Sequence, residues 1–491
     1  MLFNSYEFIF VFLPVTVLIF FQFARLSSQL AASWLVMASL FFYGWWNPIY
    51  VGLLLGSTGF NHAAGLALVR TRGLGRERIN RSILIFAIGA NLMLLGYFKY
   101  AHFFTTNLNS VLETNYSLTR IILPLGISFF TFTQIAFLVD ASRGIAREYD
   151  FVHYMLFVTY FPHLIAGPLL HHREMMPQFN KPETYRVDYQ NIAVGLTIFS
   201  IGLFKKVFFA DGMAEDVKLV FDAAAQGQIL SFKAAWGGVL SYTIQLYFDF
   251  SGYSDMAIGL SRLFGIKLPV NFNSPYKAVN IIEFWRRWHM TLSRFLRDYL
   301  YIPLGGNRGG PVRHHINLML TMLLAGLWHG AGWTFVIWGG LHGVYLAINH
   351  AWRSVRKALG HDLNNSSLIG RMASVVLTFV AVAVALAFFR ADNLEAGLSV
   401  IKSMVSTDGV AFNGKFWPIA GMLFIIWFMP NTQQIMGRFD PALPLWEKDF
   451  GATPRWLQWQ PSWVWLAITL ILNYITFSSS EKVSEFLYYQ F

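Results

Sequence analysis

Long, nearly uninterrupted apolar runs constrain the fold of this chain more than any other feature of its sequence. Several of them approach the ~20 residues that an α-helix needs to cross a bilayer. They lack the two-residue alternation that marks the strands of an outer-membrane barrel. Charged residues make up 13% of the 491 positions, whereas a soluble chain carries about a quarter. The sequence therefore predicts an all-α polytopic membrane protein.

We expect about 11–13 transmembrane or re-entrant helices in a single integral membrane domain over residues 1–491. The core is expected at about 83–350, followed by C-terminal helices over 351–491. The first run lacks the basic region and cleavage site of a signal peptide, so we expect it to be retained as a helix. The predicted spans cover residues 5–23, 30–47, 49–69, 83–99, 121–139, 152–170, 192–210, 235–260, 316–329, 333–350, 372–390, 415–430 and 462–478.

The charge distribution predicts the orientation of these spans. The net charge of +11 indicates cytoplasmic loops and contacts with anionic membrane lipids, and no nucleic acid is expected as a partner. Segment 70–81 holds five arginines and one glutamate, so it should be cytoplasmic. Three predicted spans precede it, which places the N-terminus outside. Basic residues flank the hairpin 316–350 at both ends, so these ends should also be cytoplasmic.

Several common catalytic and metal-binding patterns are missing from the sequence. Cysteine is absent, which excludes disulfides, thiol catalysis and cysteine-ligated metal. The sequence also lacks the HExxH zinc motif and the GxSxG nucleophile elbow. We therefore expect neither a bound metal nor a resident cofactor.

His329 is the first candidate for catalysis because it lies in the apolar stretch 316–348, directly before a Gly-Ala-Gly break. An ionisable side chain at membrane depth is costly and suggests a function. The arm 316–329 spans about 21 Å at ~1.5 Å per residue, which places His329 beyond the midplane on the outer side. A buried neutral imidazole is suited to act as a general base towards a hydroxyl. Trp328 and Trp333 flank it and are expected to exclude water.

The basic aromatic segment 281–301 has the pattern of a helix. Spacing of three and four residues predicts one shared face for Trp285, Trp288, His289 and Leu292. Arginines occupy the other faces, and Arg294 is spaced to pair with Asp298. Two interpretations stay open: an amphipathic interfacial helix, or an electropositive mouth for a phosphate-bearing acyl donor with His289 turned inward.

Other polar positions each have a structural and a functional interpretation. The turn at 301–310 carries Asn307 and Arg308, and it is either a simple loop or a phosphate nest. Asp249 and Asp255 lie in an apolar run, where they either pair with Arg or Trp N–H groups or form the polar wall of a tunnel or a proton relay. Asn271 opens the segment NFNSPY, whose residues are typical of a turn.

The order of five strings resembles one known family. The chain is similar to the membrane-bound O-acyltransferases (MBOAT), in the branch of polysaccharide O-acetyltransferases. The resemblance extends from about residue 1 to 350, and more loosely to 478. It implies a ring of helices around a central tunnel that joins the two membrane faces. The strings are FPHLIAGP, QLYFDFSGYSDMAIGL, NFNSPY, EFWRRWHMTLSRFLRDYLYIPLGGNRGG and LWHGAGWTFVIWGGLHG.

The same resemblance implies a function and its residues. His329 corresponds to the catalytic histidine of the family, and His289 to its second signature position. The implied reaction moves acetyl from a cytoplasmic donor, acetyl-CoA, outward across the bacterial inner membrane. The acceptor would be an exported polysaccharide, alginate or cellulose, or a periplasmic acetyltransferase partner. The candidate substrate-binding residues are Trp328, Trp288, Arg286, Arg287, Asn307, Arg308, Asn271, Asp249 and Asp255.

Two alternatives remain open at this point. One is D-alanyl transfer to teichoic acid, because a sister branch shares the expected topology. The other is a transporter for a polymer precursor, which also needs inward-facing polar groups. The absence of a visible internal repeat argues against the transporter.

Overall fold

The computed structural model describes residues 1–148, 150–363, 367–406, 409, 414, 416–443, 453–479 and 484–487. Within these residues the regular structure is helical, apart from isolated bridges such as the one between Pro269 and Leu443. The all-α prediction is therefore confirmed for the described part of the chain.

Four helical stretches among the described residues are long and apolar enough to cross a membrane, which supports a multi-pass membrane protein. Three shorter apolar helices accompany them. The long stretches are α3 (Ile49–Gly73), α4 to α5 (Glu77–Leu112), α10 to α11 (Tyr189–Ala225) and α17 (Leu368–Arg390). The shorter ones are Phe8–Ala24, α19 (Phe416–Phe428) and α21 (Trp463–Ser479).

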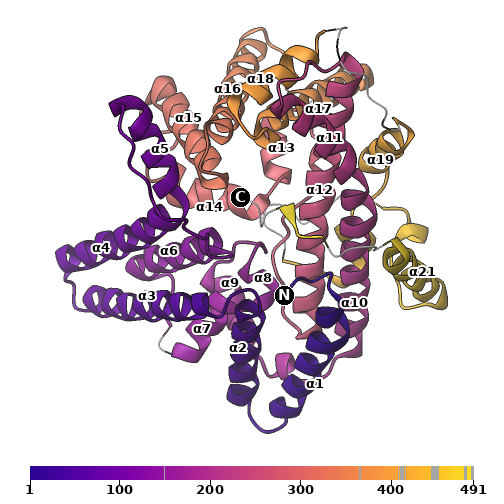
Figure 1. Ribbon diagram of the computed structural model, residues 1–491. Helices are drawn as coiled ribbons and strands as arrows, with labels where there is room; N and C mark the ends of the chain where they lie inside the picture. Colours follow the sequence, from indigo (N-terminus) through magenta and orange to yellow (C-terminus); the bar gives the residue numbers. More distant parts are fainter. Residues whose placement is uncertain are drawn as a thin grey trace.

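The remaining helices complete the architecture. In Figure 1 the longer helices stand around a middle that holds the short helices α8, α13 and α14. The bounds are α1 (Leu13–Ala24), α2 (Ser28–Gly44), α4 (Glu77–Leu95), α5 (Ala101–Leu112), α6 (Ile127–Arg143), α7 (Phe151–Thr159), α8 (Phe161–Leu164), α9 (His172–Phe179), α10 (Tyr189–Phe204), α11 (Ala214–Ala225), α12 (Phe232–Leu263), α13 (Ile281–Arg287), α14 (Met290–Leu296), α15 (Gly310–His329), α16 (Trp333–Ala358), α18 (Leu394–Ser403) and α20 (Thr432–Ile435).

The predicted span 152–170 is wrong as a continuous helix. Helix α7 ends at Thr159, and the chain turns at Tyr160 before Pro162 opens the short α8. Proline lacks a backbone N–H and clashes with the preceding turn, so it starts a new helix instead of extending the old one. The break takes the chain inward, and residues 161–172 are buried throughout.

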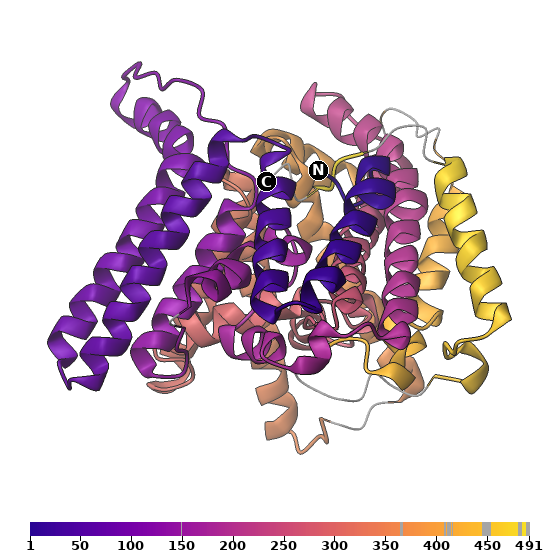
Figure 2. The same cartoon turned by 90° about the horizontal axis from the view of Figure 1, so that it is seen from below.

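The turn between α3 and α4 and the C-terminal end of α16 lie on one side of the molecule, with the N-terminus toward the other (Figure 2). The basic segment 70–81 contains that turn. The two basic regions that the sequence assigns to the cytoplasm thus share one side. The prediction that the N-terminus faces away from segment 70–81 agrees with this arrangement.

Helices α15 and α16 form the hairpin that carries His329, and their backbones are nearly in contact. A Cβ added at Gly326 would lie 2.2 Å from the Phe335 carbonyl oxygen. One added at Gly339 would lie 2.3 Å from the Met322 carbonyl oxygen. Small residues permit such close packing between helices in a membrane. The hairpin therefore holds the end of α15 in a defined position.

Replacing Gly339 with alanine should destabilise the hairpin, because the added methyl group would overlap the Met322 carbonyl. We expect a loss of roughly 1–3 kcal/mol, seen as a lower thermal unfolding midpoint of the protein in detergent. Gly340 provides a matched control, since a Cβ there meets Leu323 at an ordinary 3.5 Å. If Gly340→Ala lowered the midpoint as much as Gly339→Ala, the close approach would not be the cause.

Candidate active site

His329 is the last residue of α15 and is buried among aromatic rings. Its ring centroid lies 4.9 Å from that of Trp328, 5.1 Å from Trp338 and 5.3 Å from Phe389. Trp333 does not enclose it: this side chain is 56% exposed and donates a hydrogen bond to Asn107 Oδ1 at 2.8 Å. The prediction of a water-excluding role is therefore wrong for Trp333. Trp338 and Phe389 occupy that position instead.

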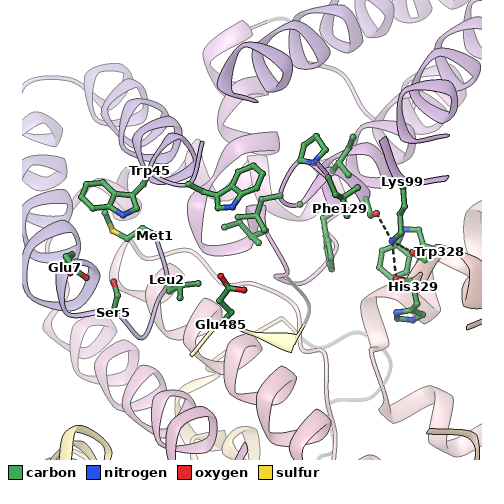
Figure 3. Close-up of a pocket in the computed structure, with 18 residues that line it drawn as sticks. Met1, Leu2, Ser5, Glu7, Trp45, Lys99, Phe129, Trp328, His329 and Glu485 are labelled. Atoms are coloured by element: carbon green, nitrogen blue, oxygen red, sulfur yellow. Dashed lines mark hydrogen bonds between the residues drawn. The ribbon is translucent and has the colours of Figure 1, made fainter. Parts of the chain in front are cut away.

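A cavity of about 600 Å³ ends at His329 (Figure 3). Trp328, His329 and Lys99 lie together at one end of it, and Met1, Trp45 and Glu485 lie across from them. Since N-terminal residues line this cavity, it belongs to the side of the molecule that the sequence assigns to the outside.

A second cavity, of about 710 Å³, lies between α13, α14, α15 and α16. On α15 it is lined from Gly310 to Met322, whereas the first cavity meets this helix at Trp328 and His329. A helix of 20 residues is about 30 Å long, so the two cavities lie toward opposite ends of α15. Arg286, Arg297 and Asn307 are among the residues that line the second cavity.

A layer of rings packed edge to face lies between the two cavities. Trp285 lines the second cavity, and its ring centroid lies 5.9 Å from Trp338 and 5.1 Å from His342. Trp338 in turn contacts His329. A narrow gap of about 20 Å³ lies within this layer and is lined by Trp288, His329 and His342. His329 therefore borders both the first cavity and this gap, whereas the gap and the second cavity have no lining residue in common.

His289, the second signature position that the resemblance implies, lies next to His329. Their ring centroids are 6.5 Å apart, and His289 is fully buried. The predicted continuous helix over 281–301 is wrong, because α13 ends at Arg287 and α14 begins at Met290. Between them His289 adopts the left-handed conformation with φ of 42°. The four aromatic and apolar residues predicted to share one helical face are therefore divided by a turn.

Asn271 supports the backbone at this turn. Its Oδ1 accepts hydrogen bonds from the Thr291 hydroxyl at 2.7 Å and the Thr291 backbone N–H at 3.3 Å. His289 Nδ1 lies 3.3 Å from the same oxygen. A left-handed non-glycine residue is strained and persists only where its surroundings hold it. Asn271 therefore holds His289 in position, in addition to its place in the predicted turn at NFNSPY.

The arginines of segment 281–301 line the second cavity or form ion pairs, and Arg297 does both. Arg286 is exposed and lines the second cavity. Arg287 pairs with Glu283 at 2.6 Å. Arg294 forms a two-bond ion pair with Glu174 of α9. The predicted pair of Arg294 with Asp298 is wrong, and Asp298 pairs with Arg297 instead at 2.6 Å.

The remaining candidates on this side and in the core are placed as follows. Asn307 accepts a hydrogen bond from the Tyr301 hydroxyl at 2.5 Å at the edge of the second cavity. Arg308 is exposed in the glycine-rich turn, outside the lining of that cavity. Trp288 is buried between Phe272 and Phe284 and lines the narrow gap.

Asp249 and Asp255 both form buried ion pairs, which favours the structural interpretation of these carboxylates. Lys206 Nζ lies 2.8 Å from Asp249, and both side chains are 2% exposed. Lys205 Nζ lies 2.6 Å from Asp255 Oδ2. Their partners are two consecutive lysines, where the sequence suggested Arg or Trp N–H groups. The structure does not place either carboxylate in the lining of the two large cavities.

Lys99 lines the first cavity and His342 the narrow gap, although neither was among the predicted residues. Tyr100 lines neither and bonds to the end of α15. Lys99 Nζ lies 2.5 Å from the Trp328 carbonyl oxygen and 3.2 Å from that of His329. The Tyr100 hydroxyl donates to the Leu327 carbonyl at 2.8 Å. Lys99 is the last residue of the predicted apolar span 83–99. The argument used for His329, that an ionisable group is costly to bury in a membrane, would therefore have identified Lys99 as well. Within the described part of the chain, no group of three His, Asp or Glu side chains is arranged to hold a metal ion.

Comparisons with known proteins identify the relatives of this chain. The model of the membrane-bound O-acyltransferase family, MBOAT, matches residues 18–382. The chain is 46% identical over 438 residues to the peptidoglycan O-acetyltransferase of Helicobacter pylori, covering 84% of this chain and 81% of the relative. It is 42% identical over 415 residues to the probable alginate O-acetylase AlgI of Pseudomonas aeruginosa, covering 83% and 75%. A teichoic acid D-alanyltransferase of Streptococcus thermophilus is 30% identical over 263 residues, covering 50% and 61%.

Removing Asp255 should unfold the region around α12 instead of weakening substrate binding, because Lys205 would keep a buried, unpaired charge. Breaking a buried pair costs about 3–5 kcal/mol, so we expect Asp255→Ala to yield little folded protein on size-exclusion chromatography in detergent. The pair of Lys218 with Asp222 has the same chemistry but is exposed, so Asp222→Ala should fold normally. A well-folded Asp255→Ala with only a raised KM would instead assign this carboxylate to substrate.

Proposed function

The chain belongs to the membrane-bound O-acyltransferase family, and we propose that it moves acetyl groups outward across the bacterial inner membrane for O-acetylation of an exported polysaccharide. One observation carries this proposal. His329 lies at one end of the first cavity and borders the narrow gap in the layer of rings, and one ring of that layer, Trp285, lines the second cavity. Donor and acceptor can thus approach one histidine from different sides.

The ring and tunnel expected for this family are part of the proposal. We propose that the two cavities and the narrow gap are segments of this tunnel. The rings of Trp285, Trp338 and His342 would form a closed layer across it. Such a layer would limit the passage of water and ions while an acyl group reaches His329. Excluding water matters here, because hydrolysis competes with acyl transfer.

Acetyl-CoA is proposed as the donor, entering through the second cavity. Arg286 and Arg297 line this cavity, which suits the phosphate groups of a nucleotide-bearing thioester. The cavity lies at the beginning of α15, where the adjoining basic segments are expected in the cytoplasm. An acyl donor made in the cytoplasm would meet it directly. Membrane lipids surround the protein, and no resident cofactor is needed for the reaction.

The proposed chemistry is a general-base acyl transfer at His329. The imidazole accepts the proton of the acceptor hydroxyl while the hydroxyl oxygen bonds to the thioester carbonyl carbon. The carbon–sulfur bond then breaks, and the leaving thiolate takes that proton to become free CoA thiol. The products are an acetyl ester and CoA, so atoms and charges balance. His289, at 6.5 Å between ring centroids, would orient His329 or its bound substrates.

The acceptor is proposed to enter through the first cavity from outside. Two of the relatives are named for acetylating peptidoglycan and alginate, so the acceptor class is a glycan of the cell envelope. Peptidoglycan joins alginate and cellulose as a candidate, because the peptidoglycan O-acetyltransferase matches over most of both chains. Transfer through a periplasmic acetyltransferase partner uses the same hydroxyl chemistry.

Substituting His329 with alanine should abolish acetylation while the protein stays folded, because the imidazole is the proposed base. The O-acetyl content of peptidoglycan and exopolysaccharides would be measured by mass spectrometry in a strain lacking the chromosomal copy and complemented with each variant. His361 is exposed on the α16–α17 connection, so His361→Ala should restore wild-type acetylation.

Three outcomes would contradict parts of this proposal. Retained acetylation with His329→Ala would remove the histidine from catalysis. D-alanyl esters in place of acetyl esters would assign the protein to the chemistry of its more distant relatives. Labelled acetyl-CoA that crosses vesicle membranes without losing its acyl group would indicate a transporter.

A further inference from the structure

Lys99 is the one charged residue of segment 82–101, and its contacts explain its position. It lies in the π-helical turn η2 (Gly96–Tyr100), within the long helical stretch Glu77–Leu112. A charged side chain at this depth is costly and needs partners. The ammonium group finds them at the end of another helix, α15, at 2.5 and 3.2 Å from two carbonyl oxygens.

The carbonyl end of α15 needs these donors. The last four carbonyl groups of a helix lack partners within it, and the dipole gives that end partial negative charge. Tyr100 donates to the carbonyl of Leu327, while Lys99 donates to those of Trp328 and His329. Two adjacent residues of η2 thus bind three successive carbonyls. A π-helical turn, with its wider spacing, is a recurrent device at functional sites.

Lys99 also lines the first cavity, whereas Tyr100 does not. Lys99 lines the 600 Å³ cavity together with His329, as Figure 3 shows, and its Nζ lies 3.4 Å from the Ser128 hydroxyl. The ammonium is 5.8 Å from the centroid of the Trp328 ring. It is a cation placed beside the imidazole, in the space where an acceptor would attack the acyl carbon.

We propose that Lys99 acts in the acyl transfer in two ways: its bonds to the end of α15 position His329, and its ammonium group supplies positive charge to the reacting centre. This inference rests on the proposed function. When the acceptor oxygen adds to the thioester carbonyl, the carbonyl oxygen gains a negative charge while His329 takes the proton. A nearby ammonium stabilises that charge until the carbon–sulfur bond breaks and the charge passes to the thiolate. Lys99 keeps its protons throughout, so the balance of the reaction is unchanged.

The test compares Lys99→Met, Lys99→Arg and Tyr100→Phe. Tyr100→Phe is the matched control, because it removes one donor to the same helix end without removing charge or altering the cavity lining. Inverted inner-membrane vesicles carrying the full chain and its partners would receive [14C]acetyl-CoA at increasing concentrations. The rate of label transfer to envelope glycan then yields kcat and KM for each variant.

We expect Lys99→Met to lower kcat by roughly 10²-fold with KM for acetyl-CoA changed less than about threefold. Lys99→Arg should recover part of that loss, because it restores both donors and charge. Tyr100→Phe should stay within about threefold of wild type. Thermal unfolding in detergent would show whether each variant is folded before its rate is interpreted.

Several results would overturn the inference. Near-normal kcat in folded Lys99→Met would remove the residue from the reaction. Equal losses in Lys99→Met and Tyr100→Phe would make Lys99 only a helix cap, and so would failure of both Lys99 variants to fold. His329→Ala separates this inference from the proposed function: if it stays active, the proposed function fails, and if it is inactive while Lys99→Met is normal, only the role of Lys99 fails.

Discussion

The site depends on how one helix ends inside the protein. Helix α15 ends at the buried His329, and a buried carbonyl group without a hydrogen-bond partner costs several kcal/mol. Lys99 and Tyr100 meet that need from a neighbouring helix. The buried histidine is consequently held through its own backbone. The close contact of α15 with α16 fixes the same point from the other side.

The ionisable groups in the core fall into two kinds, which differ in their surroundings. Asp249, Asp255 and Arg294 each have an oppositely charged partner, and these pairs connect separate elements of the fold. His289 and His329 are instead surrounded mainly by aromatic rings, and His329 also lines the first cavity and the narrow gap. A buried ion pair stabilises one arrangement, whereas an imidazole that lines a cavity can exchange a proton with a substrate. This contrast is why the proposed chemistry rests on His329 and not on the aspartates.

Much of this arrangement could be predicted from the sequence, because helices and costly polar residues leave local signals. The apolar runs predicted α3, α12, α17 and the hairpin of α15 with α16 to within several residues. The segment 281–301 was mispredicted, because the left-handed turn at His289 is held by Asn271, about 18 residues earlier in the chain. Spacing along a helix carries no information about such a contact. Phe389, and not the predicted Trp333, packs against His329. Phe389 belongs to α17, so this contact also depends on the tertiary structure.

The narrow gap beside His329 bears on which acyl groups the protein accepts. Its volume of about 20 Å³ is close to the space of a single water molecule. The rings of Trp338 and His342 that bound it belong to α16, whose backbone is held against α15 by Gly326 and Gly339. A long acyl chain would have to displace these rings and so loosen the hairpin that positions the imidazole. An acetyl group adds only one methyl beyond the reacting carbonyl and needs a much smaller displacement. Under the proposed function, in which the acyl group passes this gap, the packing that holds His329 therefore favours a short acyl group such as acetyl.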